Sequence, residues 1–202
     1  MNPKALIIDL CGPLLTIDTG RIDRRLHALG VTTKDCYRTL YHEGKVKQFD
    51  LGLLSPAEFC DNMREVLHCD LDDHSLLDCW NDLIVDFDLR NIEALRQLGA
   101  RYRLFLLSNS DVENEARFRQ YINDKAGFDL FATCFEAAYF SNHLHLRKPD
   151  PAIFIEIMRR HGLEASETML LDDCRQHCEN ARTVGLQARQ CSDLLFRCLP
   201  IE

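Results

Sequence analysis

The sequence lacks several features that would assign it to a specialised class of protein. No apolar run approaches the roughly 20 residues of a membrane-spanning helix, so we expect no membrane partner. Basic residues are not in excess: the formal net charge is −8, which argues against a nucleic-acid partner, since such binders need a basic face. Internal repeats and low-complexity tracts are absent as well. What is present is 46% hydrophobic residues in a chain of 202, enough for a folded core of ordinary size.

The ten cysteines lack the regular spacing of a disulfide framework. An apolar, strand-like segment begins close to the N-terminus, so we expect no signal peptide. Reduced thiols that act mostly as small buried hydrophobic residues are therefore expected, in a cytoplasmic protein.

Apolar strand-like runs alternate with helical patterns along most of the chain. The runs are residues 5–10, 103–107, 134–139, 168–171 and 186–189. Three of the helical patterns stop at Gly99, Gly162 and Gly185, each of which is expected to end its helix in the left-handed conformation. Alternating strands and helices predict an α/β fold with a doubly wound parallel sheet.

Residues 16–87 do not follow this alternation, and we find no strand pattern there. Four helical segments are expected instead, one of them starting with a Ser-x-x-Glu capping box at Ser55. A segment of about 70 residues is too long for a loop. We therefore predict a discontinuous α/β core, residues 1–15 and 88–202, with a helical cap inserted at residues 16–87.

Polar residues follow each predicted core strand. The first strand ends in Asp9, the second in Ser108-Asn109-Ser110 and the fourth in Asp172-Asp173, and the third leads to Lys148. Ligands of open α/β sheets bind outside the carboxyl ends of the strands, so these groups are expected to converge. Three carboxylates can hold Mg²⁺, and a lysine and a hydroxyl can offset the charge of a phosphoryl group. A carboxylate in line with the phosphorus can then attack it, giving an aspartyl-phosphate.

These motifs, in this order, resemble those of the haloacid dehalogenase (HAD) superfamily of hydrolases. The matching segments are "DLCGPL" at Asp9, "LFLLSNS" at Ser108, "RKPDPAIF" at Lys148 and "LLDD" at Asp172 and Asp173. The resemblance spans nearly the whole chain, and the inserted helices resemble the helical cap of that family. The subgroup that contains bacterial sugar-1-phosphate phosphatases and the phosphatase domain of soluble epoxide hydrolases is particularly similar.

The resemblance implies a role for each matching residue. Asp9 would be the catalytic nucleophile and a Mg²⁺ ligand, and the backbone carbonyl of Cys11 would be another ligand. Asp173 would bind the metal, with Asp172 bound to it or just behind it. Ser108, Asn109 and Lys148 would hold the phosphate, and Lys148 would also screen Asp9 from the incoming anion. The implied substrate is a small phosphorylated metabolite; the oligomeric state is not indicated.

Cys11 departs from the family pattern, which has a general-acid Asp at this position. Loss of a general acid–base typically costs roughly 10²–10⁴ in rate, and a thiol with an ordinary pKa of about 8.5 replaces it poorly. Three functions therefore remain open: a phosphatase for substrates with good leaving groups, a catalytically impaired regulatory protein that binds metal and phosphate, and a haloacid dehalogenase. The intact acidic pair disfavours the dehalogenase, which needs no metal.

Three weaker candidates accompany these motifs. The spacing of Cys174, His177 and Cys178 permits a zinc site but supplies too few ligands, so we interpret the two cysteines as helix-face thiols. His143 and His145 are interpreted as loop residues rather than substrate contacts. Because caps set specificity in the family, the predicted cap loop with Lys45, Lys47 and Gln48 is one that can face the site.

Overall fold

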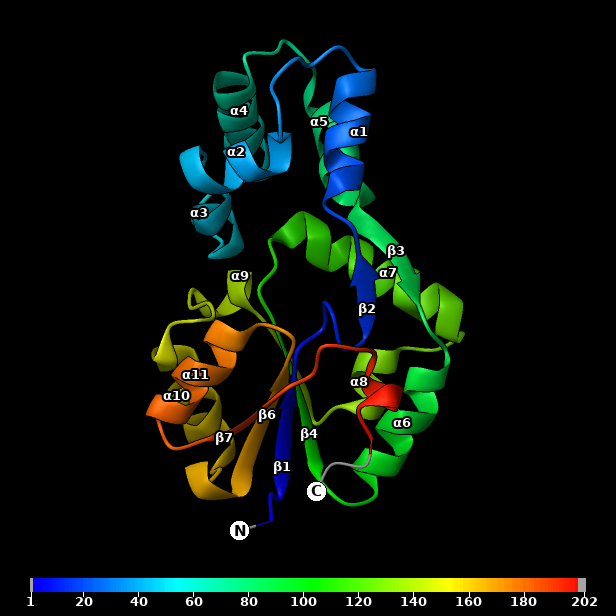
Figure 1. The fold of residues 1–202 in the computed structure, drawn as a ribbon, viewed down its shortest axis with the longest axis vertical. Coiled ribbons are helices and arrows are strands. Elements are labelled where there is room, and N and C mark those ends of the chain that lie inside the picture. Colours follow the sequence, from blue (N-terminus) through cyan, green and yellow to red (C-terminus); the bar gives the residue numbers. More distant parts are fainter. Residues whose placement is uncertain (1, 200–202) are drawn as a thin grey trace.

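The computed structural model describes residues 2–199 and is built on a five-stranded parallel sheet (Figure 1). The strand order is β5-β4-β1-β6-β7. The strands are β1 (Ala5–Ile8), β4 (Arg103–Ser108), β5 (Ala137–Phe140), β6 (Thr168–Asp172) and β7 (Gln187–Gln190). Every residue of β1 and β6 is buried, as expected where helices cover both faces of a sheet.

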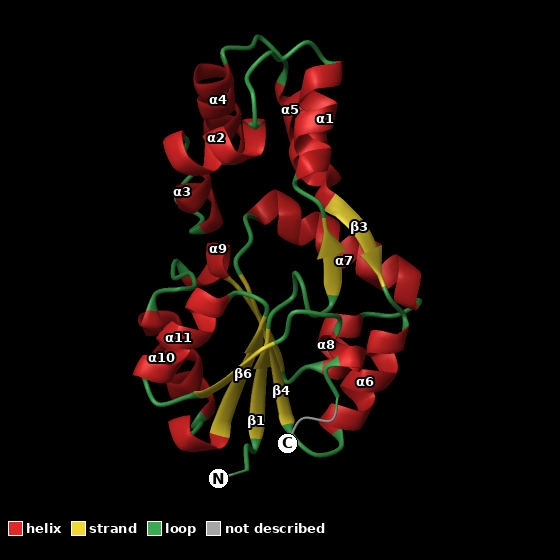
Figure 2. Ribbon diagram, viewed as in Figure 1, coloured by secondary structure: helices red, strands yellow, loops and turns green. Residues whose placement is uncertain are grey.

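Helices lie on both faces of the sheet, which confirms the doubly wound α/β fold (Figure 2). One face carries α10 (Pro151–His161) and α11 (Arg175–Thr183), packed against Ile7 of β1. The other face carries α6 (Arg90–Gly99), α7 (Val112–Ala126) and α8 (Leu130–Cys134), packed against Leu6 and Ile8. Successive side chains of a strand point to opposite faces, so the unbroken apolar run of β1 contributes to both cores.

A separate group of helices stands beyond the carboxyl ends of the strands (Figure 1). It consists of α1 (Gly20–Ala28), α2 (Cys36–Glu43), α3 (Val46–Asp50), α4 (Pro56–Leu67) and α5 (Asp73–Trp80). We call these five helices the helical cap. The capping box at the start of α4 is present, because Ser55 and Glu58 each accept a hydrogen bond from the backbone N–H of the other.

Two short strands join the helical cap to the sheet. β2 (Leu15–Ile17) and β3 (Ile84–Phe87) form an antiparallel ribbon. The 3₁₀ turn η1 (Asn81–Leu83) directly precedes β3. The prediction that residues 16–87 contain no strand is therefore wrong at both ends of that segment. Strands of three and four residues carry too little alternation to be recognised without their partner. Both predicted domain limits fall in this ribbon, and we propose the ribbon as the junction.

Three other local predictions are wrong. The predicted loop with Lys45, Lys47 and Gln48 is instead mostly helical, because Lys47 and Gln48 lie in α3. The strand expected at residues 134–139 begins later, at Ala137, because Cys134 ends α8. Gly99 is the last residue of α6, and Ala100 after it has φ −70°, so neither adopts the left-handed conformation; Gly162 and Gly185 do adopt positive φ values of 58° and 87°. The remaining short elements are α9 (Ser141–Leu144), η2 (Ala165–Glu167) and η3 (Leu195–Arg197).

The cysteines follow the prediction with one exception. Eight are free thiols, four of them buried. Cys191 and Cys198 form a disulfide, so the prediction of reduced thiols is wrong for that pair. The cytoplasmic location stays a prediction.

Within residues 2–199, no helix combines the length and the apolar character needed to cross a lipid bilayer.

Candidate active site

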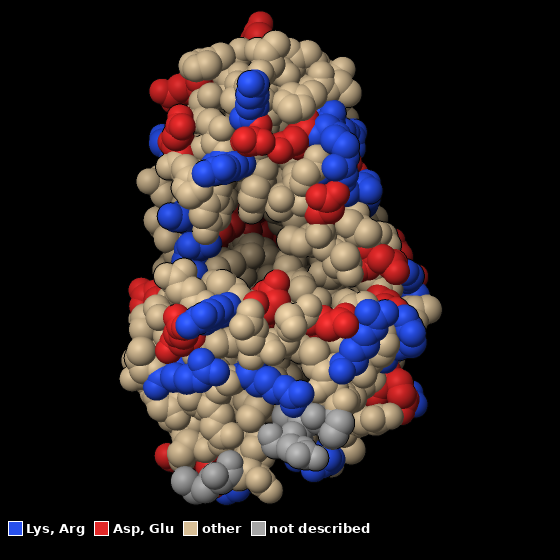
Figure 3. All heavy atoms as spheres, in the orientation of Figure 1, with Lys and Arg blue, Asp and Glu red and all other residues tan. Residues whose placement is uncertain are grey.

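The polar residues predicted at the strand ends meet at one edge of the sheet. Asp9 follows β1, Ser108 ends β4 and Asp172 ends β6, and β1 pairs with both of the other strands. A cavity of about 580 Å³ lies between this edge and the helical cap, and it opens to the surface with acidic groups inside (Figure 3). Of the predicted site residues, six line the cavity: Asp9, Cys11, Ser108, Asn109, Lys148 and Asp173. Asp172 is fully buried behind them.

The Lys148 ammonium lies between two of the carboxylates. Its Nζ is 2.9 Å from Asp9 Oδ1 and 2.7 Å from Asp172 Oδ2. It also donates a hydrogen bond to the carbonyl of Leu107 at 3.1 Å. Lysine has three N–H donors, so each of them has an acceptor. Lys148 is therefore a buried, fully paired cation that fixes the position of Asp9.

The two carboxylates that contact Lys148 differ in their electrostatics. Burial raises the pKa of Asp9 to about 8. The Lys148 ammonium acts to lower this pKa, and the Asp172 carboxylate acts to raise it. Burial also acts to raise the pKa of Asp172, but Lys148 and His177 outweigh it and hold that pKa below its usual value. Burial acts to lower the pKa of Lys148, yet the two carboxylates outweigh it and raise that pKa. Asp172 is thus the carboxylate that stays ionised. Asp9 is the carboxylate whose ionised form a further positive charge would stabilise most.

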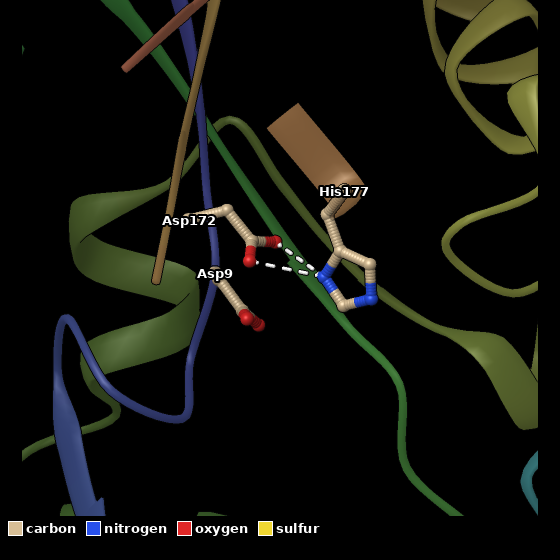
Figure 4. Close-up of side chains that lie close together, drawn as sticks. All are labelled: Asp9, Asp172 and His177. Atoms are coloured by element: carbon tan, nitrogen blue, oxygen red, sulfur yellow. Dashed lines mark hydrogen bonds and ion pairs between the residues drawn. The ribbon is translucent and has the colours of Figure 1, made fainter. Parts of the chain in front are cut away.

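His177, in the first turn of α11, points toward Asp172 (Figure 4). Its Nδ1 lies 3.0 and 3.1 Å from the two carboxylate oxygens. Asp9, Asp172 and His177 together offer three ligand atoms within 4.8 Å of one another. However, the Lys148 ammonium already bridges Asp9 and Asp172 and would repel a cation placed between them. We therefore interpret His177 as a hydrogen-bond partner of Asp172 rather than a metal ligand.

Asp173 presents a more open carboxylate. Its backbone carbonyl accepts a hydrogen bond from Gln190, and its carboxylate forms no ion pair with another described residue. Burial and the neighbouring Asp172 raise its pKa. Gly12 packs directly against it, with φ +95°, and a Cβ added at Gly12 would lie 2.6 Å from Asp173 Cγ. Glycine at this position therefore lets the Asp9 segment approach Asp173 closely.

The residues after β4 organise the opposite side of the site. Ser108 Oγ shares a hydrogen bond of 2.8 Å with Ser110 Oγ. Asn109 binds the backbone of Lys148 twice: its Nδ2 donates to the carbonyl and its Oδ1 accepts from the N–H, both at 2.8 Å. The Asn109 side chain thus positions the Lys148 segment with one of its two amide N–H groups and its oxygen.

Cys11 lies half-buried at the cavity wall. Burial and the nearby Asp9 carboxylate raise the pKa of its thiol. The thiol therefore stays protonated at neutral pH and holds its proton too tightly to act as an efficient general acid.

The far wall of the cavity contains groups that the motifs did not predict. Tyr37, Tyr41 and Trp80 of the helical cap line it. So do Asp50, at the end of α3, and Arg147, which precedes Lys148. In the sequence, Asp50 is one of many acidic residues at a helix end, and nothing there reveals that it meets Arg147.

The weaker candidates lie mostly outside the cavity. The loop interpretation is wrong for His143, which lies in α9 and pairs with Glu115 at 2.7 Å. His145 follows α9, and its Nδ1 lies 2.8 Å from the carbonyl of Leu51. The segment with Lys45, Lys47 and Gln48 reaches the cavity through Val46 and Asp50 instead. Cys178 is buried, with its thiol near the carbonyl of Asp172, as expected for a helix-face thiol.

The charges of this edge determine which ligands it accepts. Among the described residues in contact with Asp9, Asp172 and Asp173, Lys148 is the permanent cation, and His177 adds a positive charge only when its imidazole is protonated. An anionic ligand therefore needs additional positive charge, which a divalent cation bound to the open carboxylates supplies. With that charge, Asp9 can attack an electrophilic phosphorus.

The chain is similar to proteins of known activity and structure. It is 25% identical to the D-ribitol-5-phosphate phosphatase of Bacteroides thetaiotaomicron, over 93% of this chain and 91% of that protein. A HAD family enzyme from the same species, solved in complex with magnesium and inorganic phosphate, has a TM-score of 0.81 and 27% identity over 94% of both chains. An L-2-haloacid dehalogenase from Xanthobacter autotrophicus shares the fold, with a TM-score of 0.63 and 16% identity over 93% of this chain and 77% of that one. The model of the haloacid dehalogenase-like hydrolases matches residues 4–185, so the chain belongs to that family.

Proposed function

We propose that this protein is a Mg²⁺-dependent phosphatase that hydrolyses a small sugar or polyol phosphate through an aspartyl-phosphate on Asp9. The observation that carries the proposal is the buried Lys148 between Asp9 and Asp172, beside the open carboxylate of Asp173. This arrangement orients a carboxylate nucleophile and leaves an acidic face for a cation. The similarity to a D-ribitol-5-phosphate phosphatase and to a magnesium–phosphate complex supports the same assignment.

The donor set at Asp9 and Asp173 fits a magnesium ion. Mg²⁺ prefers oxygen ligands and is usually held by one or two carboxylates plus substrate oxygens and water. We assign Asp9, Asp173 and the backbone carbonyl of Cys11 as its ligands, with Gly12 leaving the space. Asp172 already accepts from Lys148, His177 and the backbone N–H of Cys174, so we assign it to orienting Lys148. When bound, the ion offsets the charge of the phosphoryl group.

Each residue of the site has its own role in the reaction. The Asp9 carboxylate attacks the phosphorus, the bond to the leaving oxygen breaks, and water later hydrolyses the aspartyl-phosphate. Lys148 keeps Asp9 in position and reduces its repulsion of the incoming anion. The Ser108 hydroxyl and the backbone N–H of Asn109 bind phosphate oxygens, while the Asn109 side chain holds the backbone of Lys148.

A panel of phosphorylated metabolites assayed with Mg²⁺ tests this function directly. We expect hydrolysis of at least one sugar phosphate at ordinary enzyme efficiency, and its loss when a chelator removes the metal. Binding of Mg²⁺ and phosphate without turnover of any panel member would favour the catalytically impaired regulatory protein, for which the Cys11 replacement is the supporting observation. Hydrolysis that a chelator leaves unchanged would contradict the role of Asp173 and favour the dehalogenase.

Cys11→Asp is expected to increase activity modestly, and only on substrates with poor leaving groups. An alkyl alcohol leaves badly without a proton, whereas a nitrophenolate leaves without one. The gain is limited because a new carboxylate near Asp9 and Asp173 adds negative charge. The measurement is the ratio of kcat/KM, variant over native, for one alkyl and one aryl phosphate. Equal ratios would show that leaving-group protonation is not what Cys11 lacks.

A further inference from the structure

A buried ion pair lies on the cavity wall, contributed half by the helical cap and half by the core. Arg147 Nη2 is 3.1 Å from Asp50 Oδ2, and the two side chains are 15% and 11% exposed. Both line the cavity that also contains Asp9. The pair takes no part in the phosphoryl transfer described above.

The pair has hydrogen-bonding capacity that the described residues do not use. Arg147 Nε is buried without a partner, and the ion pair is the one contact found at the Asp50 carboxylate. Burial raises the pKa of Asp50 to about 7, although Arg147 acts in the opposite direction. Charges removed from water in this way are costly unless additional hydrogen bonds compensate them. A ligand with hydroxyl groups would provide those bonds.

An aromatic surface adjoins the pair. The rings of Tyr37 and Trp80 stack with centroids 5.9 Å apart, and Tyr37 stacks on Tyr41 at 6.2 Å. Tyr37 lines the cavity together with Asp50, and burial and the charge of Asp50 raise the pKa of its hydroxyl. A flat apolar face beside paired donors and acceptors suits the carbon skeleton and the hydroxyl groups of a sugar.

We propose that Asp50 and Arg147 bind the end of the substrate remote from the phosphate, and that Asp50 makes the enzyme select neutral, hydroxyl-rich ends over acidic ones. This inference rests on the proposed phosphatase function and specifies its substrate class. Adjacent hydroxyls can donate to the Asp50 carboxylate and accept from the Arg147 guanidinium. A terminal carboxylate or a second phosphate that approaches Arg147 also comes close to the negatively charged Asp50. The two like charges repel each other in this poorly solvated part of the cavity.

A purely structural role for the carboxylate of Asp50 is disfavoured by the other contacts between α3 and α9. Ser141 Oγ donates to the backbone carbonyl of Asp50 at 2.6 Å. At Gly52, an added Cβ would lie 2.3 Å from the carbonyl of Asn142, so the backbones are in close contact. These interactions do not involve the Asp50 carboxylate and persist in an Asp50→Asn variant.

The test compares glucose 1-phosphate with glucuronic acid 1-phosphate, which differ only in a hydroxymethyl or carboxylate group at C6. We expect native kcat/KM to favour the neutral sugar about tenfold or more, given the cost of like charges at a binding site. Asp50→Asn should reduce this preference about tenfold by leaving Arg147 free for the carboxylate, and Arg147→Gln should increase it. Asp61→Asn, the same change at an exposed position on the helical cap, should leave the ratio unchanged.

Dissociation constants of the same two ligands for the Asp9→Asn protein with Mg²⁺ provide a readout that does not depend on turnover. The same preference in binding supports the inference even if neither compound is hydrolysed, a result that would count against the phosphatase function alone. Equal affinities, or a ratio that Asp50→Asn and Arg147→Gln do not move in opposite directions, would overturn the inference. In that case the pair would be only a contact between the helical cap and the core, and hydrolysis of other phosphates would leave the phosphatase function standing.

Discussion

Replacing Asp9 with asparagine is expected to lower kcat/KM for an aryl phosphate by at least about 10⁴-fold, the scale seen when a covalent nucleophile is removed. The amide cannot attack phosphorus, and it also removes one negative charge from the proposed magnesium site. The fold should persist, because Lys148 keeps its ion pair with Asp172 at 2.7 Å and its hydrogen bond to Leu107. Steady-state kinetics with Mg²⁺, together with circular dichroism of the variant, check this prediction.

The matched control for the Asp9 variant is Asp61→Asn, the same chemical change on the exposed surface of α4. Its kcat/KM should equal that of the native protein. Full activity of Asp9→Asn would show that another group attacks the phosphorus, and the mechanism proposed here would be wrong. Equal losses in both variants would instead indicate a general effect of reduced net charge.

The strand-end cluster could be predicted from the sequence because it depends on local pattern and simple topology. The apolar run before Asp9 indicates a strand buried on both faces, and the run before Asp172 indicates another. Parallel strands place their carboxyl ends at one edge, so the two carboxylates had to lie near each other. Lys148 was expected near them because its segment leads to the same edge of the sheet. The distances from its ammonium to the two carboxylates could not be predicted.

The contacts that were missed depend on how distant segments pack. His177 reaches Asp172 only because α11 starts at Arg175 and turns the imidazole back toward β6. Asp50 contacts Arg147 only because the helical cap packs over the core. No periodicity in either segment indicates that the two side chains lie close together. The ribbon of β2 and β3 was missed for the same reason, because each short strand can be recognised only from its pairing with the other.

Lys148→Met is expected to produce the second large effect, on both activity and stability, because it keeps the buried chain length and removes the charge. In the native protein the pKa of Asp172 lies below its usual value, so its contribution to stability is present above that usual value and is lost as the pH falls. Without the ammonium, burial and the facing Asp9 carboxylate raise the pKa of Asp172 above that of the unfolded chain, and the already raised pKa of Asp9 rises further. For Asp172 the sign of the pH dependence then reverses, and stability is lost as the pH rises through the raised pKa values of both carboxylates.

The free energy of unfolding of Lys148→Met at pH 7.5 should therefore fall by about 3–5 kcal/mol, the usual cost of breaking a buried ion pair on one side. Part of this loss should be recovered at pH 5.5, where the facing carboxylates can take up a proton, and kcat/KM should fall at least about 10³-fold. Denaturant unfolding at the two pH values measures the first effect, with Lys125→Met as the control, since Lys125 is a partly exposed lysine paired with Asp86 at the surface. If Lys148→Met were destabilised equally at both pH values, lost packing rather than unbalanced carboxylate charge would be the cause, and Lys148 would not be the group that balances the charges of Asp9 and Asp172.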